Sequence, residues 1–300
     1  VSANPTGPMH IGHARGAVYG DALANILKKC GYNVTKEYYV NDAGSQIETL
    51  VDSLLIRYKE ALSGKKASIP EGFYPGEYLA VLGKKLALEY KSTLLEMDES
   101  AMRQKLKKIA ISEMVELIKL DLQKLGVKHD VFTSEQTLHD NGKIDEAVAI
   151  LTKMELIYRG VLPPPKGKID ENWEEKEQLL LRSSNYGDDQ DRPIQKSDGS
   201  WSYLAADFAY AKDKIDRGFD CLIYIHSGYV KRIKAVIEAL GAGKVKSDIR
   251  TSQLVNFVKG NEPIKMSKRS GNFMTVSDVI NDVGKDIIRF IMLTRRNEMY

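Results

Sequence analysis

Two short segments near opposite ends of the chain carry residues that could act on a phosphorylated substrate. Residues 4–13 read Asn-Pro-Thr-Gly-Pro-Met-His-Ile-Gly-His, and residues 265–272 read Lys-Met-Ser-Lys-Arg-Ser-Gly-Asn. The first segment combines glycines, which let a ligand lie against the backbone, with two histidines three positions apart at the start of a predicted helix. The free N–H groups of a helix start attract phosphate. We therefore predict that residues 4–13, the histidine turn, bind a triphosphate.

The second segment, residues 265–272, is a predicted loop with three cations. Lys265, Lys268 and Arg269 lie within five residues, and Gly271 gives the backbone freedom to move. Lysines on a mobile loop can stabilise negative charge that develops only in a transition state. A solvated basic loop is the ordinary interpretation of such a charge run. The order of the two segments favours a shared role, in which a triphosphate is held while its α-phosphorus is attacked.

The composition is typical of a globular enzyme. The chain has 300 residues, 43% hydrophobic and 28% charged, and a net charge of +3 that neither indicates nor excludes a nucleic-acid partner. It contains no apolar run of about 18 residues and no signal-peptide pattern at its start. Cys30 and Cys221 lack metal-type spacing and are typical of reduced thiols. We expect a cytoplasmic protein without a membrane segment, and a chain cut from a longer protein.

Hydrophobic periodicity predicts the elements that must position these residues. The opening turn, a helix that ends at Gly31 and a strand over 33–40 predict part of a parallel βαβ unit. Helical patterns fill residues 46–126. Further strands are predicted at 127–133, 178–182, 193–203, 221–225 and 251–259, with a hairpin turn at Asp198 and Gly199. Further helices are predicted at 144–156, 204–216, 230–240 and from 276 onward. The order of these elements predicts an α/β fold interrupted by a helical block.

Tyr203 and Asp207 lie four positions apart on a predicted helix, so they share one face. An ionised aspartate can accept two parallel hydrogen bonds from a guanidinium, and a tyrosine can add an acceptor or a stacking face. Spacing alone favours structural roles, with Tyr203 in the core and Asp207 in a local cap or pair. Asp188, Asp189 and Asp191 are interpreted as a solvated acidic turn, since no histidine or cysteine joins them. No metal site is predicted.

The two end segments resemble the HIGH and KMSKS motifs of class I aminoacyl-tRNA synthetases, and almost the whole chain resembles the catalytic domain of bacterial arginyl-tRNA synthetases. The resemblance is also carried by residues 1–8, 39–46, 72–78, 187–189, 197–201 and 203–207. It implies a Rossmann-like parallel sheet split by a largely helical insertion. The implied parts are residues 1–45 and 127–285 as the two halves of the catalytic domain, 46–126 as the insertion, and 286–300 as the start of a helical C-terminal region, without the anticodon-binding domain.

The same resemblance implies an arginine–tRNA ligase. Such an enzyme uses ATP, with Mg²⁺, to convert L-arginine to arginyl-adenylate and transfers the arginyl group to the terminal adenosine of tRNA-Arg; we expect a monomer. The implied catalytic residues are His10, His13, Lys265 and Lys268. ATP would be bound by Pro5, Thr6, Gly7, His10, Gly12, His13, Met266 and Ser267, and arginine by Asn4, His13, Tyr203, Asp207 and His226.

The chain departs from the family pattern before His226, because the usual Gly-Ala-Asp is missing after residues 221–225. Alternatives therefore stay open. The protein could be another class I synthetase or a nucleotidyltransferase, although it lacks a zinc-type cysteine set and carries the Tyr203 and Asp207 pair. It could instead be a non-catalytic synthetase-like module that binds RNA. The intact motif residues His10, His13, Lys265 and Lys268 argue against that last alternative.

Overall fold

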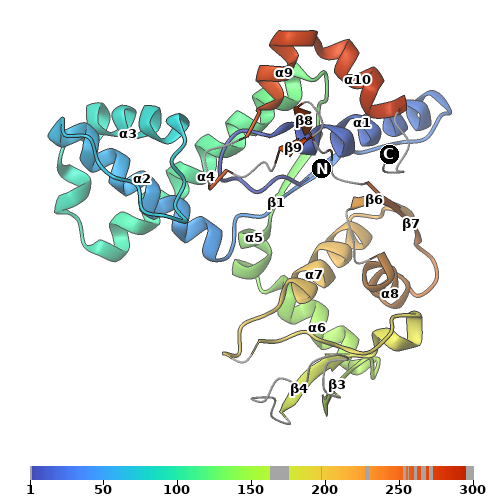
Figure 1. Cartoon of the computed structure of the whole chain (residues 1–300). Coiled ribbons are helices and arrows are strands. Elements are labelled where there is room, and N and C mark those ends of the chain that lie inside the picture. The colour runs from blue at the N-terminus through green and yellow to red at the C-terminus, as the bar shows by residue number, and fades with distance from the viewer. Residues whose placement is uncertain are drawn as a thin grey trace. The chain divides into compact units, whose positions relative to one another are not determined.

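The protein divides into two compact units (Figure 1). The computed structural model describes residues 2–162, 176–196, 198–226, 230–252, 255, 257–259, 262–264, 268–269 and 273–294. The first unit comprises Val1–Ser134 and Ser252–Tyr300, and the second comprises Glu135–Thr251. Both ends of the chain thus belong to the first unit. The expected division into family domains follows different boundaries and stays a prediction.

The first unit opens with the predicted turn, helix and strand. A short 3-10 helix, η1 (Ile11–His13), leads directly into α1 (Ala14–Lys29), and β1 (Glu37–Val40) pairs in parallel with β2 (Val131–Ser134). Each strand begins four residues later than predicted. The cause is local, because Tyr32 N and Val127 N still donate to the last turns of the preceding helices, and pairing starts only where Asp130 N donates to Lys36 O at 2.7 Å.

Three long helices form a separate core within the first unit. They are α2 (Ser45–Ser63), α3 (Glu77–Tyr90) and α4 (Glu99–Lys124), with a 3-10 turn, η2 (Thr93–Glu96), between the last two. Leu54, Leu79 and Leu106 are fully buried in this core. The Asp98 side chain caps α4 by accepting from Ser100 N and Ala101 N. The helices expected over residues 46–126 are therefore confirmed as secondary structure.

The C-terminal end of the chain completes the first unit. Strands β8 (Phe257–Lys259) and β9 (Glu262–Ile264) form an antiparallel pair, and α9 (Val276–Val283) and α10 (Lys285–Thr294) follow. Figure 1 shows α10 beside α1, and Arg289 of α10 donates to the buried Asp21 of α1 at 2.8 Å. Lys36 donates to the same carboxylate at 2.7 Å. The core of this unit joins Ile11 and Tyr38 to Val276 and thus packs both ends of the chain together.

The second unit combines a small antiparallel sheet with a parallel strand pair. Its elements are α5 (Glu135–Asp140), α6 (Lys143–Lys153), β3 (Ile157–Val161), β4 (Glu177–Leu181), η3 (Ser183–Tyr186), β5 (Arg192–Pro193), α7 (Tyr203–Asp216), β6 (Cys221–His226), α8 (Val230–Leu240) and β7 (Lys246–Thr251). Strands β3, β4 and β5 are antiparallel, whereas β6 and β7 are parallel. Both units thus combine helices with parallel strands, as the α/β prediction required. No helix in the described parts of the chain is long and apolar enough to cross a membrane.

Two predicted strands are wrong in extent. The hairpin turn expected at Asp198 and Gly199 within residues 193–203 is confirmed, since Ser200 N donates to the Asp198 carboxylate and an antiparallel bridge joins Gln195 to Trp201. The strand beside this turn is shorter than predicted, because it comprises only β5. The strand expected over 251–259 is two strands, since β7 ends at Thr251 and β8 begins at Phe257. The boundary between the units lies at Thr251, so the two strands pair within different units.

Close packing between α2 and α3 gives a stability prediction. A Cβ atom on Gly83 would lie 2.7 Å from the backbone carbonyl of Arg57. Helix propensity alone favours alanine over glycine by about 1 kcal/mol. We expect Gly83→Ala to destabilise the fold by about 1–2 kcal/mol because overpacking outweighs that gain. Thermal unfolding measures the change. The exposed neighbour Lys84→Ala is the control, and a higher unfolding temperature for Gly83→Ala would contradict the packing argument.

Candidate nucleotide-binding site

The two histidines of the turn lie against each other. His10 is the extended residue before η1, and His13 closes this short helix by donating its backbone N–H to His10 O at 3.0 Å. The ring centroids are 3.7 Å apart and the rings are tilted by 32°. The spacing of three therefore places both imidazoles where one ligand could contact them.

Both imidazoles are neutral at physiological pH. Burial and the charge of Lys268 together lower the pKa of His10 to about 4. Burial, the charge of His10 and the charge of Lys268 together lower the pKa of His13 to about 3. The Nδ1 atoms of both rings are buried and lack a hydrogen-bond partner among the described residues. A neutral imidazole still offers one N–H donor. The pair is suited to donate hydrogen bonds to an anion, not to form an ion pair with it.

The backbone of the histidine turn is shaped by a tyrosine of α3. The Tyr78 hydroxyl donates to the carbonyl of the buried Thr6 at 2.6 Å. Gly7 has φ +148°, and a Cβ atom there would lie 2.6 Å from the Tyr78 ring. Glycine is therefore required at position 7, because the backbone conformation disfavours other residues and the Tyr78 ring leaves no space for a Cβ atom. The sequence contained Tyr78 in a family-like segment but gave no reason to place it at the site.

Lys268 lies on the histidine turn. Its ammonium donates to Gly7 O at 2.9 Å and to Asn4 O at 3.3 Å. Burial lowers the pKa of Lys268 to about 8, so the cation still predominates at pH 7. The structure thus places one lysine of the C-terminal motif beside the N-terminal motif. Lys265, Met266 and Ser267, which were predicted for catalysis and ATP binding, lie outside the described residues.

The backbone also joins the two motifs. Ile11 N donates to Met274 O at 3.1 Å, and Val276 N donates to Met9 O at 2.8 Å. These bonds form an antiparallel bridge between His10 and Thr275. Because Thr275 follows the lysine loop by only a few residues, the C-terminal anchor of that loop is attached to the histidine turn.

A buried carboxylate that the sequence analysis missed supports this bridge. Asp121 of α4 is only 5% exposed and accepts hydrogen bonds from Met9 N at 2.8 Å and from Ser277 Oγ at 2.7 Å. The sequence did contain a signal for Asp121, because its carboxylate lies next to Leu122 on the buried stripe of a predicted helix. A buried carboxylate usually has a specific hydrogen-bond partner.

Asn4 is held in a cluster of side-chain amides. Its Nδ2 donates to Gln46 Oε1 at 2.7 Å, and its Oδ1 accepts from Asn41 Nδ2 at 3.2 Å. Gln46 lies in the first turn of α2, while Asn41 directly follows β1. Two elements of the first unit thus fix the orientation of the Asn4 amide, which the sequence predicted to hold arginine.

The remaining predicted arginine-binding residues belong to the second unit. Tyr203 begins α7 and is 68% exposed, so the alternative that it packs in the core is wrong. Asp207 is half-buried, and burial raises its pKa to about 7 while the charge of Lys214 opposes that rise. His226 ends β6, and its side chain lies outside what the structure describes.

The acidic turn of the second unit is paired internally. Arg192 donates to Asp188 at 2.9 Å and also pairs with Asp189. Asp191 accepts from Tyr158 at 2.7 Å and from Ser184. The expectation of a solvated turn is therefore wrong for Asp188, because its carboxylate is engaged in a nearly buried ion pair.

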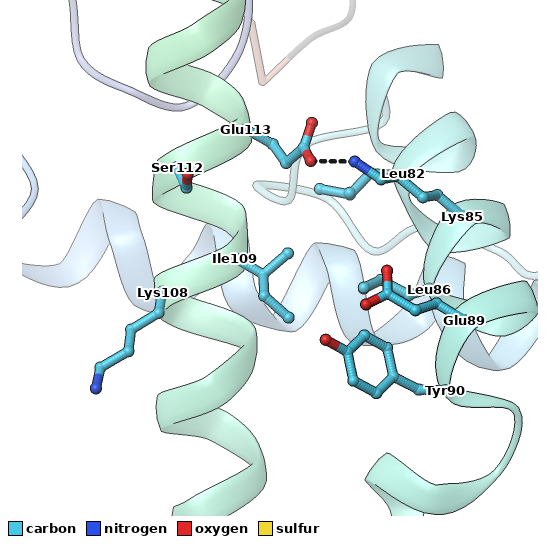
Figure 2. A pocket seen from close by; sticks show the side chains of 9 residues that line it. All are labelled: Leu82, Lys85, Leu86, Glu89, Tyr90, Lys108, Ile109, Ser112 and Glu113. Carbon is cyan, nitrogen blue, oxygen red and sulfur yellow. Dashed lines mark hydrogen bonds and ion pairs between the residues drawn. The ribbon is translucent and has the colours of Figure 1, made fainter.

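A shallow cavity of about 330 Å³ lies between α3 and α4, apart from the histidine turn (Figure 2). An ion pair between Lys85 and Glu113 crosses it, and Lys108 points away from it. None of the predicted site residues lines this cavity. We therefore assign the candidate site to the histidine turn instead.

The histidine pKa values predict a pH-dependent stability. Both values lie below the ordinary 6.5, so the unfolded chain binds these protons first as the pH falls. Stability is present above pH 6.5 and is lost as the pH falls towards 4, by about 1–2 kcal/mol for each histidine at pH 5. His10→Asn/His13→Asn should reduce the difference in unfolding temperature between pH 7 and pH 5. An equal difference in the variant would refute the assigned burial.

Comparisons with known proteins identify the family of the chain. The family model described as tRNA synthetases class I (R), catalytic domain, matches residues 1–299. Arginine–tRNA ligases of Rickettsia bellii and Rickettsia canadensis are 64% and 62% identical to the chain over 99% of its length. The chain spans about half of each relative, since it covers 52% of their length.

Two solved structures that resemble this chain are also arginyl-tRNA synthetases by name. A protein of Campylobacter jejuni assigned as an arginyl-tRNA synthetase matches with a TM-score of 0.81 and 37% identity, over 100% of this chain and 62% of its own. The arginyl-tRNA synthetase of Thermus thermophilus has a TM-score of 0.59 over 97% of this chain and 55% of its own, and at 15% identity it shows the fold alone. The chain therefore belongs to the family of class I arginyl-tRNA synthetase catalytic domains.

Proposed function

We propose that the complete protein is an arginine–tRNA ligase, and that this chain supplies the site where ATP and L-arginine form arginyl-adenylate. The observation that carries the proposal is the Lys268 ammonium bound to the histidine turn, beside two neutral imidazoles whose centroids are 3.7 Å apart. Residues 10–13 would act as the HIGH motif and residues 265–269 as the KMSKS motif. Residues 46–126 would be the helical insertion. The activated arginyl group would then pass to tRNA-Arg.

The chemistry of activation fits these side chains. The arginine carboxylate attacks the α-phosphorus of ATP, and pyrophosphate leaves with additional negative charge on its oxygens. His10 and His13 donate hydrogen bonds to phosphate oxygens, while Lys265 and Lys268 stabilise the charge on the leaving group. Mg²⁺ would arrive with the ATP substrate and would help to neutralise the phosphate charge. Pro5, Thr6, Gly7, Gly12, Met266 and Ser267 complete the proposed ATP contacts.

Arginine recognition is assigned to residues of matching chemistry. Asp207 offers a carboxylate to the substrate guanidinium, and the exposed Tyr203 ring offers a stacking face or an acceptor. Asn4, His13 and His226 complete the proposed set. We further propose a cytoplasmic monomer, with tRNA-Arg as its macromolecular partner.

The role of Lys268 is tested by Lys268→Met in the complete protein. We expect adenylate formation to fall about 10²–10³-fold with a much smaller change in ATP affinity, because the cation acts mainly in the transition state. The measurements are arginine-dependent ATP–pyrophosphate exchange with tRNA-Arg present, and ATP binding at equilibrium. Lys108→Met is the matched control, since this exposed lysine points away from its neighbours (Figure 2). If the rate and the ATP affinity fall equally, Lys268 does not act mainly in the transition state. If the wild-type protein shows no arginine-dependent exchange, the ligase proposal is refuted.

The pKa of Asp207 predicts how arginine binding responds to pH. With a pKa of about 7, the carboxylate is largely protonated at pH 6 and ionised at pH 8. The KM for arginine should therefore fall as the pH rises through 7. Asp207→Asn should remove this dependence and raise KM by about 10–100-fold, the equivalent of a lost charge-assisted hydrogen bond.

Asp213→Asn is the matched control for this experiment. Asp213 lies on the same helix and pairs with Arg217 at 2.9 Å. The Asp213→Asn substitution should leave the pH dependence of the arginine KM unchanged. A retained pH dependence in Asp207→Asn would assign the titration to another group.

A further inference from the structure

The Tyr78 side chain joins the helical core of the first unit to the histidine turn. Tyr78 lies in the first turn of α3, and its hydroxyl donates to Thr6 O at 2.6 Å. A Cβ atom on Gly7 would lie 2.6 Å from the Tyr78 ring, and a Cβ atom on Gly76 would overlap the same ring. The ring therefore occupies a slot that exists because both glycines lack a side chain.

Helix α2 fixes the segment that carries Tyr78. Arg57 donates to Pro75 O at 2.8 Å, and Tyr74 N donates to Ser53 Oγ at 3.0 Å. Both Tyr74 and Ser53 are buried. Because these two donors and acceptors belong to α2, the segment before α3 is held on that helix, and Tyr78 meets the histidine turn from a fixed support.

Thr6 lies between the two carbonyls that bind Lys268. The Lys268 ammonium donates to Gly7 O at 2.9 Å and to Asn4 O at 3.3 Å. Thr6 N donates to the same Asn4 O at 2.7 Å, while Thr6 O accepts from Tyr78. Since a glycine backbone rotates easily, the direction of Gly7 O depends on how its neighbour is held. Tyr78 holds that neighbour.

The same segment also contacts the residue after Lys268. The Arg269 guanidinium lies over the Tyr74 ring, 5.8 Å from its centroid, which is within the range of a cation–π interaction. Tyr74 and Tyr78 thus contact the lysine loop and the histidine turn, respectively. Two aromatic side chains of one short segment support both motifs.

We propose that Tyr78 is a positioning residue for adenylate formation, whose hydroxyl holds Thr6 so that the carbonyls of Asn4 and Gly7 place the Lys268 ammonium where pyrophosphate departs. The inference rests on the proposed function of this site. Tyr78 acts on the reaction through Lys268. Such positioning matters because a misplacement of about 1 Å can lower a rate about 10²-fold.

Tyr78→Phe removes the hydroxyl and keeps the ring in its slot. Tyr58→Phe is the matched control, because Tyr58 is buried in the same helical core and its hydroxyl also donates to a backbone carbonyl, that of Lys91. Both variants lose one bond between a hydroxyl and a carbonyl, so a general loss of stability would affect them alike. Thermal unfolding compares their stabilities.

The first test measures how firmly Lys268 is held in the complete protein. Lysines are labelled with acetic anhydride at one pH, and peptide mass spectrometry gives the labelling rate of Lys268 relative to the exposed Lys108. Tyr78→Phe should raise this relative rate about 2–10-fold, the effect of one lost hydrogen bond, because the ammonium loses its fixed acceptors. Tyr58→Phe should leave the rate unchanged. An unchanged rate in Tyr78→Phe would overturn the inference.

The second test is a double-mutant cycle on arginine-dependent ATP–pyrophosphate exchange with tRNA-Arg present. Tyr78→Phe should lower kcat about 10-fold and change the KM for ATP by less than about twofold. In the Lys268→Met background the same substitution should lower kcat by less than about twofold, because the group that Tyr78 positions is absent. An equal loss in both backgrounds would overturn the inference. Failure of the ligase proposal is distinguishable, because it would abolish exchange in the wild-type protein while the labelling rates would still report on the hold of Tyr78 over Lys268.

Discussion

The backbone pairing between Met9–Ile11 and Met274–Val276 is the constraint on which the rest of the first unit depends. It joins segments from opposite ends of the chain, and closing so long a loop costs conformational entropy that grows only slowly with length. Burial of Met9, Ile11 and Val276 in one core offsets that cost. The pairing gives the lysine loop a fixed C-terminal anchor, so Lys268 can reach the carbonyls of the turn.

The charges of the proposed site are set by Lys268 and by the protonation of the two histidines. Among the described residues of the histidine turn and the lysine loop, Lys268 places a positive charge on the turn, while burial keeps His10 and His13 neutral. If the imidazoles were protonated, their repulsion would destabilise the ammonium that lies on the same turn. The neutral rings avoid that repulsion and can still donate hydrogen bonds to an anionic ligand. The carbonyls of Asn4 and Gly7 hold the cation without neutralising it, which leaves its charge available to an anionic ligand.

The sequence predicted features that depend on local patterns and missed those that depend on distant partners. Helix α1 and strand β6 follow apolar periodicity, and the two motifs follow residue types at fixed spacing. Strand β7 has a polar sequence, and only its pairing with β6 makes it a strand. Asp121 accepts from Met9, 112 positions away, and Tyr78 donates to Thr6, 72 positions away. Periodicity can mark such residues as unusual, but it cannot identify their partners.

Under the proposed function, the state of Asp207 shows how a residue that selects the substrate can stay available to it. A fully ionised buried carboxylate would need a permanent cationic partner, and that partner would compete with an arginine side chain. Lys214 instead donates to Tyr224 at 2.9 Å and lies over the Tyr210 ring, so it affects Asp207 through its field. Burial then leaves Asp207 close to half-protonated at neutral pH. An arriving guanidinium would favour the ionised form, whereas an uncharged isostere would meet a partly protonated carboxyl. Under the proposed function, Asp207 therefore becomes fully ionised only when a cationic side chain binds to it.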